Sequence, residues 1–139
     1  LYITWETYQC GNVLSLIVSC GWDFDMNTYS VYLYDTATGE QMTTAQLLET
    51  LQVEPETFLA AVRQAAAERF DGKYAGIGGD TDELVAERRA WTLSDENINL
   101  DVMTYADAAG NLYVYLPIGS IAGAASYEEP LTLDLGAAG

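Results

Sequence analysis

The spacing of apolar residues changes period twice along this chain, and this change constrains the fold more than any other feature. Residues 1–9 alternate with the two-residue period of a strand, and residues 13–20 are apolar on both faces, as in a central strand. Residues 28–36 are rich in tyrosine and β-branched side chains. With a hairpin turn at Gly11 and Asn12, these segments predict a three-stranded antiparallel meander.

In the middle of the chain the apolar residues recur at helical spacing instead. Thr44 is expected to cap a short helix that reaches about Leu51, and Pro55 fits the first turn of a second helix that Gly72 ends. Residues 80–83 read as a capping box, which predicts a third helix as far as about residue 90.

Strands return in the last third of the chain. Residues 98–105 and 112–118 flank a hairpin loop, and residues 131–135 are expected to form a last strand. The order predicts an α+β fold, an antiparallel sheet of meander plus C-terminal hairpin with two or three helices packed on one face. We expect residues 1–139 to be a single domain and a fragment of a longer protein, because residue 1 already lies inside a strand.

The charged residues exclude several classes of function. The chain has 139 residues, of which 21 are acidic, 5 are basic and none is histidine, for a formal net charge of −16. Without histidine there is no Ser-His-Asp or Cys-His triad and no histidine-ligated zinc. Nucleic acid and bare anionic membranes are disfavoured because both need a basic surface. With no assembled catalytic motif, we expect no catalytic residue, cofactor or metal site.

The few bases are unevenly placed. All of them lie in the predicted helical region, at Arg63, Arg69, Lys73, Arg88 and Arg89. One interpretation is an ordinary mixed-charge helical surface with acidic flanks that maintain solubility. The other is that the acidic flanks face a cationic partner, which would speed association.

The two cysteines and the apolar runs limit covalent and membrane chemistry. Cys10 and Cys20 fall at opposite ends of the first predicted hairpin, too far apart for a disulfide, so both are expected to be free. No apolar run approaches the roughly 18 residues of a membrane span, so we expect no direct membrane insertion of this portion.

The connection between the second and third predicted strands is the candidate partner-binding site. It places large apolar side chains between acids on a loop, where such residues are often functional. The candidate residues are Trp22, Asp23, Phe24, Asp25 and Met26. The alternative is that alternate residues of this loop tuck under the edge of the sheet.

The same loop partly matches a calcium site. Asp23, Asp25 and Asn27 stand where an EF-hand loop has its first three oxygen ligands. However, Thr28 replaces the required glycine, and Tyr34 replaces the bidentate glutamate at the twelfth position. An acidic strand connection is therefore favoured over a calcium site.

Other charged pairs have structural interpretations. Glu128 and Glu129 are adjacent, so on a strand their side chains point to opposite faces and cannot act as a catalytic pair. Arg88 and Arg89 lie near the end of a predicted helix, where they complement its dipole. The glycine-rich residues 76–79 precede acids that repel phosphate, which disfavours a nucleotide loop.

Two ordered sets of segments resemble the extracytoplasmic domain of the anti-sigma-V factor family of Gram-positive bacteria. The first set is NVLSLIV at residues 12–18, YSVYLYD at 29–35, Thr-Gly at 38–39 and TAQLL at 44–48. The second is GNLYVY at 110–115 followed by IAGA at 121–124. The family often carries a histidine-containing glycine-rich segment where this chain has residues 21–27.

This resemblance implies an α+β domain outside the membrane. In the best-known member, the domain binds lysozyme, a cationic protein, and controls proteolytic release of a sigma factor. We therefore expect a non-catalytic extracytoplasmic sensing domain whose partner is a cationic protein or a cell-wall component. Two alternatives remain: a carboxylate-dependent glycosidase-like enzyme that uses two of the acids, and a structural module of a surface protein.

Overall fold

The protein folds as strands, helices and strands in that order. The computed structural model describes residues 1–21, 27–77 and 79–138. Its strands are β1 (Tyr2–Cys10), β2 (Val13–Gly21), β3 (Asn27–Asp35), β4 (Gln41–Met42), β5 (Met103–Ala106), β6 (Leu112–Gly119) and β7 (Ser126–Thr132). Its helices are α1 (Thr44–Thr50), α2 (Pro55–Tyr74), the short 3-10 helix η2 (Gly79–Thr81), α3 (Asp82–Thr92) and α4 (Leu135–Ala138).

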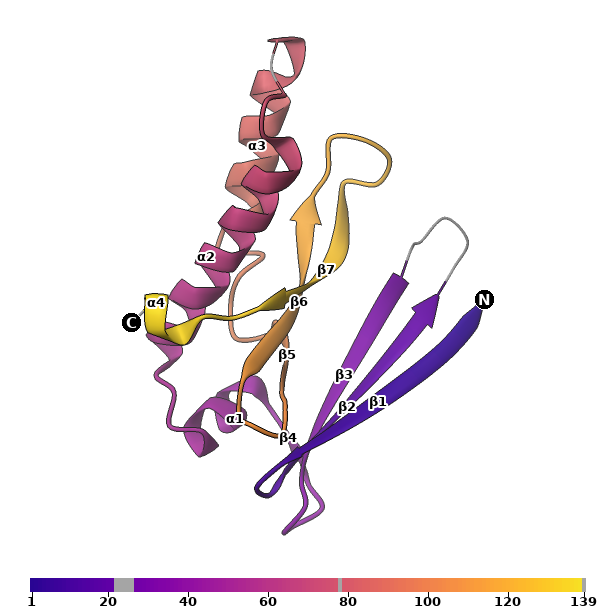
Figure 1. Cartoon of the computed structure of the whole chain (residues 1–139), viewed down its shortest axis with the longest axis vertical. Coiled ribbons are helices and arrows are strands. Elements are labelled where there is room, and N and C mark those ends of the chain that lie inside the picture. Colours follow the sequence, from indigo (N-terminus) through magenta and orange to yellow (C-terminus); the bar gives the residue numbers. More distant parts are fainter. Residues whose placement is uncertain (22–26, 78, 139) are drawn as a thin grey trace.

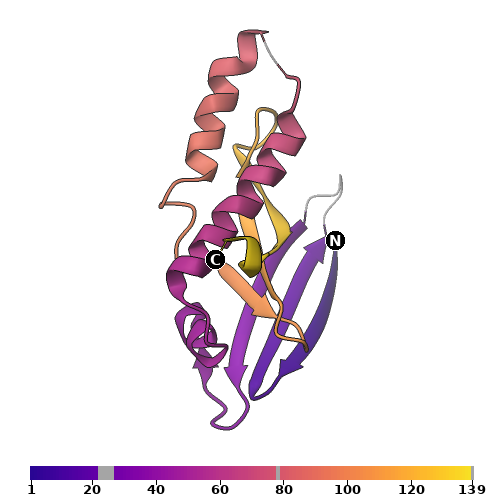
Figure 2. The same ribbon diagram turned by 60° about the vertical axis from the view of Figure 1, so that its left-hand side comes forward.

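The elements form three layers (Figures 1 and 2). One antiparallel sheet has the order β1-β2-β3-β4, and a second has the order β5-β6-β7. Helices α2 and α3 contact β6 on one side of the second sheet, while the first sheet contacts β5 and β7 on the other. The predicted antiparallel α+β class is confirmed, and the meander and the C-terminal strands belong to two stacked sheets.

The first hairpin matches its prediction closely. Residues 11 and 12 form a two-residue turn in which Gly11 has a φ of 56°, and Cys10 pairs with Val13 across it. The ladder then continues without a break to the pair Tyr2 and Gly21. A positive φ at the first turn position suits glycine and matches the twist of the strands.

The helix boundaries differ from the predictions at three points. Thr43, not Thr44, caps α1 and forms a capping box with Gln46. Helix α2 begins at Pro55 as expected, but it continues through Gly72 to Tyr74. A glycine inside a helix costs only about 1 kcal/mol relative to alanine, so it does not by itself end the helix. The N-cap of α3 is Thr81, one residue after the cap of the predicted box at residues 80–83, and Thr81 makes no side-chain capping bond; the side chain of Asp80 lies outside the described part of the structure.

Two C-terminal strand predictions also need correction. The strand expected at residues 98–105 is shortened to β5, because residues 98–102 form turns in which the Asn99 side chain bonds Asp95 and Glu96 carbonyls. The last strand is β7 rather than residues 131–135, and its register brings Glu128 opposite Pro117. Strand β6 is as predicted, extended by one residue.

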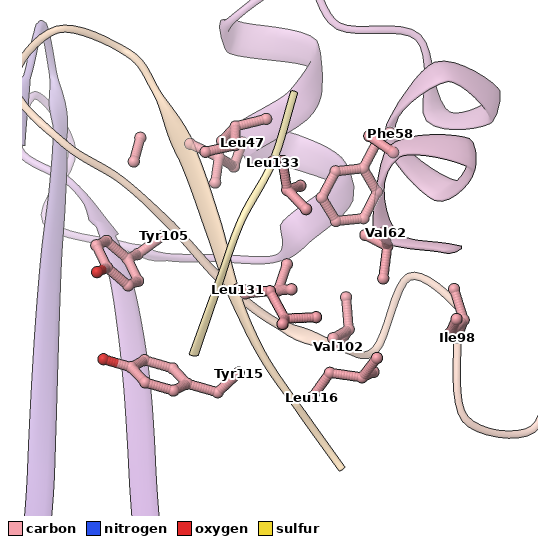
Figure 3. Packing of buried hydrophobic residues seen from close by; sticks show 14 of the residues in the cluster. Leu47, Phe58, Val62, Ile98, Val102, Tyr105, Tyr115, Leu116, Leu131 and Leu133 are labelled. Carbon is pink, nitrogen blue, oxygen red and sulfur yellow. The ribbon is translucent and has the colours of Figure 1, made fainter. Parts of the chain in front are cut away.

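The core spans both interfaces of the central sheet. Phe58 and Val62 approach from α2, while Tyr105 and Tyr115 point from the second sheet toward the strands of the first (Figure 3). The hydroxyl of Ser15 on β2 accepts a hydrogen bond from the Ala106 backbone N–H on β5 at 3.4 Å. Every buried side-chain nitrogen or oxygen in the described ranges has a hydrogen-bond partner.

No helix in the part of the chain that the structure describes is long and apolar enough to cross a membrane.

Candidate functional site

The five residues predicted to bind a partner, Trp22, Asp23, Phe24, Asp25 and Met26, lie outside the described residues. Their flanking positions are described: Gly21 ends β2, Asn27 begins β3, and the two residues pair with each other. Across β2, Gly21 also pairs with Tyr2. The candidate loop is therefore anchored at the end of the first sheet where β1 begins.

This end of the sheet carries the most exposed large apolar side chains in the described residues. The exposed fractions are 76% for Leu1, 62% for Tyr2, 58% for Ile3 and 73% for Trp5. We call these four residues the β1 apolar segment. Ile3 and Trp5 share one side of β1, and Tyr2 lies on the other. Single exposed apolar residues are common, but neighbouring ones on one side of a strand are typical of an interface.

Tyr2 occupies a specific place within this segment. Its ring covers the backbone of Gly21, and a Cβ built at Gly21 would lie 2.2 Å from the ring. An aromatic side chain across from a strand glycine shields the bare backbone and helps to fix the register. Tyr2, Ile3 and Trp5 are thus held in a regular strand, which Leu1 precedes.

The side of the first sheet that faces away from the second sheet has no charged side chain within its strands. The inner side is identified by Tyr8, Ser15 and Tyr29, which contact the second sheet, so the alternate residues point outward. We call this side the outer face. Its strand residues are Ile3, Trp5, Thr7, Gln9, Leu14, Leu16, Val18, Cys20, Thr28, Ser30, Tyr32, Tyr34 and Gln41.

An uncharged face is unexpected in a chain with a net charge of −16. Both views show the helices on the far side of the second sheet, away from the outer face (Figures 1 and 2). Leu14, Leu16 and Val18 are half-buried, and their shielding comes from neighbours within the sheet rather than from the core. The outer face is therefore uncharged, and its exposed large apolar side chains are Ile3, Trp5 and Tyr32.

The five basic side chains lie on helices α2 and α3, in the helical layer, and each contacts an acceptor of the chain itself. Arg69 and Lys73 both contact the Glu129 carboxylate, at 3.0 and 2.9 Å, and the Arg88 Nε donates to the Ser120 carbonyl. Arg63 pairs with Asp95, and Arg89 makes two bonds to Asp71. Arg88 and Arg89 therefore have partners within the chain, Ser120 and Asp71, and Arg89 lies in the last turn of α3.

A second candidate site is an acidic cleft of about 300 Å³ beside β6 and β7. Its carboxylates come from Glu96, Asp101 and Glu128, and Tyr115 forms part of its wall. Burial raises the pKa of Glu128, which the Tyr29 backbone N–H partly opposes by bonding to the carboxylate. Glu128 faces this cleft and Glu129 faces α2, which confirms that the two side chains point to opposite sides.

The space between the two sheets is filled by stacked tyrosines. We call this group the tyrosine stack: Tyr8, Tyr29, Tyr105, Tyr113 and Tyr115. The pKa of Tyr8 is raised to about 12, mainly because its hydroxyl donates a hydrogen bond to Glu6 and to a lesser extent because it is shielded from solvent. Burial likewise raises the pKa of Tyr115 and Tyr105. The raised pKa values keep the hydroxyls of Tyr8, Tyr105 and Tyr115 protonated at neutral pH.

The described residues offer little for a metal or a redox centre. Cys10 and Cys20 are free, as expected. No group of three His, Cys, Asp or Glu side chains in the described ranges is arranged to hold a metal ion. Asn27, Thr28 and Tyr34 lie along the extended strand β3, and an extended strand cannot wrap around an ion as an EF-hand loop does.

Sequence reasoning missed both the outer face and the acidic cleft. The alternation of residues 1–9 was visible, but the face that would be left uncovered depended on how the sheets stack. The cleft joins residues 96–103 to β6 and β7, and no local motif links these segments.

Comparisons of this chain with protein-family models, with curated proteins and with solved structures found no match.

Proposed function

We propose that this chain is a non-catalytic extracytoplasmic sensing domain that binds a cationic protein or a cell-wall component. The observation that carries the proposal is the β1 apolar segment, which is exposed at the end of the sheet that anchors residues 22–26. Aromatic and aliphatic side chains of this kind form the centres of protein interfaces. The resemblance to the anti-sigma-V factor family supports the same assignment.

Electrostatics supports a cationic partner. The bases lie on α2 and α3 and contact acceptors of the chain itself, which leaves a large acidic excess elsewhere. A field of this sign accelerates encounter with a cationic protein and is screened by salt. The uncharged outer face provides the apolar contact that charge alone does not supply.

A titration of the purified domain tests this proposal. Lysozyme, as a cationic protein, and peptidoglycan fragments would be added at low and at high salt. We expect binding of one of them, and for lysozyme a weakening of the affinity as salt rises. The absence of binding to both probes at both salt concentrations would overturn the proposal.

A pair of variants locates the binding surface. Trp5→Ser removes the largest exposed side chain of the β1 apolar segment and is expected to weaken binding by about tenfold or more. Ile77→Ser is the matched control, because Ile77 is also exposed, at 42%, but follows α2 on another layer. Equal weakening by the two substitutions would argue against this surface.

A carboxylate-dependent glycosidase is the second candidate function. It is favoured by the acidic cleft, where burial raises the pKa of Glu128 as a general acid requires. Release of sugars from peptidoglycan fragments that Glu128→Gln abolishes, and that Glu49→Gln leaves intact, would establish it. If no probe binds and no sugar is released, a structural module of a surface protein becomes the favoured function.

A further inference from the structure

In the part of the chain that the structure describes, the edge of β1 that faces away from β2 pairs with no other strand. β1 is the edge strand of the first sheet, and its nine residues pair with β2 without a bulge. Native edges are commonly protected by charged side chains, proline or a bulge; β1 has no lysine, proline or bulge, and Glu6 is its one charged residue. An edge of this kind is suited to accept an added strand.

The hairpin geometry determines which backbone groups face this edge. Cys10 and Val13 flank a two-residue turn and therefore form a hydrogen-bonded pair. Antiparallel pairs alternate between hydrogen-bonded and non-hydrogen-bonded, so the residues at odd positions of β1 direct their N–H and C=O groups away from β2. Ile3, Trp5 and Thr7 thus present backbone donors and acceptors along the open edge.

Both sides of β1 have room for the side chains of an added strand. The residues from Tyr2 to Thr7 are exposed whichever face they point to. On the outer face, the added side chains would lie beside Ile3 and Trp5, which are apolar. On the inner face, they would lie beside Glu6, which is the only charged residue of β1.

Glu6 selects the charge of the added strand. Its carboxylate accepts the Tyr8 hydroxyl at 2.7 Å and remains exposed. A second copy of this chain would bring another Glu6 and another net charge of −16 toward the same edge. A strand with lysine or arginine beside Glu6 gains a cross-strand charge pair instead.

We propose that the cationic partner binds by adding an extended segment to β1, with apolar side chains on the outer face and a lysine or arginine beside Glu6. This inference rests on the proposed function and names how the partner is held. Main-chain hydrogen bonds to Ile3, Trp5 and Thr7 supply affinity, and the two rows of side chains supply selectivity.

A defined peptide tests edge pairing directly. The probe is a capped nonapeptide of alternating valine and lysine, and amide hydrogen exchange of the whole domain is followed by NMR. We expect the peptide to slow exchange at Ile3, Trp5 and Thr7 by about tenfold or more. The same peptide with two consecutive central amides methylated blocks both of its edges and is expected to give no protection.

A matched pair of variants tests the role of Glu6. Glu6→Gln retains an acceptor for Tyr8 and is expected to weaken peptide affinity by about two- to fivefold. Glu40→Gln removes the same charge from the turn after β3 and is expected to leave the affinity unchanged. Equal effects would mean that only the overall charge matters, which would overturn the selection by Glu6.

The outcomes separate this inference from the proposed function. Equal binding of the methylated and unmethylated peptides, or no binding of either, overturns edge pairing. A peptide-free dimer with the β1 amides already protected also overturns it, in favour of a second copy. Lysozyme or peptidoglycan binding with the β1 amides unprotected overturns edge pairing alone, while peptide pairing without binding of either natural probe overturns the proposed function alone.

Discussion

The ring of Tyr29 on β3 stacks on the ring of Tyr115 on β6, with centroids 4.0 Å apart and planes inclined by 16°. This contact joins the two sheets, and Tyr115 also forms part of the wall of the acidic cleft. Because Tyr29 lies two residues from the start of β3, it also connects the packing between the sheets to the end of the first sheet that anchors residues 22–26.

The stack is expected to contribute measurably to stability. In a double-mutant cycle of Tyr29→Ala and Tyr115→Ala, the coupling free energy should be about 0.5–1.5 kcal/mol. Urea unfolding of the four proteins measures it. Tyr32→Ala on the outer face is the control, because its effect and that of Tyr115→Ala should add to within about 0.5 kcal/mol. Strictly additive effects of the two substitutions would contradict a direct energetic contact.

Stability should fall at alkaline pH. The pKa of Tyr8 is about 12 in the folded protein against 10.0 for an ordinary tyrosine, and the pKa of Tyr115 is also raised. A raised pKa means that the folded state holds the proton more tightly, so this stability is present below pH 10 and is lost as the pH rises toward 12. Urea midpoints between pH 8 and 12 measure the loss, which Tyr115→Phe should reduce. A urea midpoint of the native chain that does not change between pH 8 and 12 would contradict the prediction.

Gly119 is expected to tolerate no side chain. A Cβ there would lie 2.9 Å from both the Arg88 carbonyl oxygen and the Thr92 Oγ1, where β6 meets α3. Gly119→Ala should therefore destabilise the fold by about 1–3 kcal/mol. Gly72→Ala is the control, since Gly72 lies within α2 with open space around it and should gain about 0.5–1 kcal/mol. Thermal unfolding of both variants distinguishes a close approach of backbones from a general effect of glycine.

Gln52 stores backbone strain at the end of α1. Its φ is 58°, and it follows the C-cap Leu51, with Val53 N–H bonding to the Leu48 carbonyl as in a Schellman motif. Glycine adopts this conformation without steric cost, so Gln52→Gly should stabilise the protein by about 0.5 kcal/mol after its greater unfolded-state entropy is deducted. Gln52→Val, with a β-branched side chain at a positive φ, should destabilise it. Chemical denaturation of both variants checks the signs.

Local signals predicted most elements, although several boundaries were wrong. The two-residue turn at Gly11 and Asn12 and the proline at the start of α2 could be recognised because each depends on the backbone conformation of one or two residues. Residues 98–102 were misassigned as strand. Their apolar residues Ile98 and Val102 are buried from turns, and burial alone does not distinguish a turn from a strand.

The exposed side of the first sheet could not be predicted from local sequence patterns. The apolar residues on both sides of β2 predicted a central strand, and β2 does lie between β1 and β3. However, its fully buried residues, Val13, Ser15, Ile17 and Gly21, all lie on the inner side, while the alternate residues on the outer side are half-exposed. Hydrophobicity could not indicate which side the second sheet would cover.

The sequence by itself determined the α+β class, the order of strands and helices, the absence of histidine chemistry and the acidic balance, because these depend on composition and on periods of two to four residues. Only the tertiary structure decided that the strands form two sheets, that Glu128 lines the acidic cleft while Glu129 pairs with bases of α2, and that β1 is an edge strand beside an uncharged face. These features arise from contacts between segments that are distant in the chain. The free energy of such packing depends on both partners, so the local sequence of one segment does not determine it.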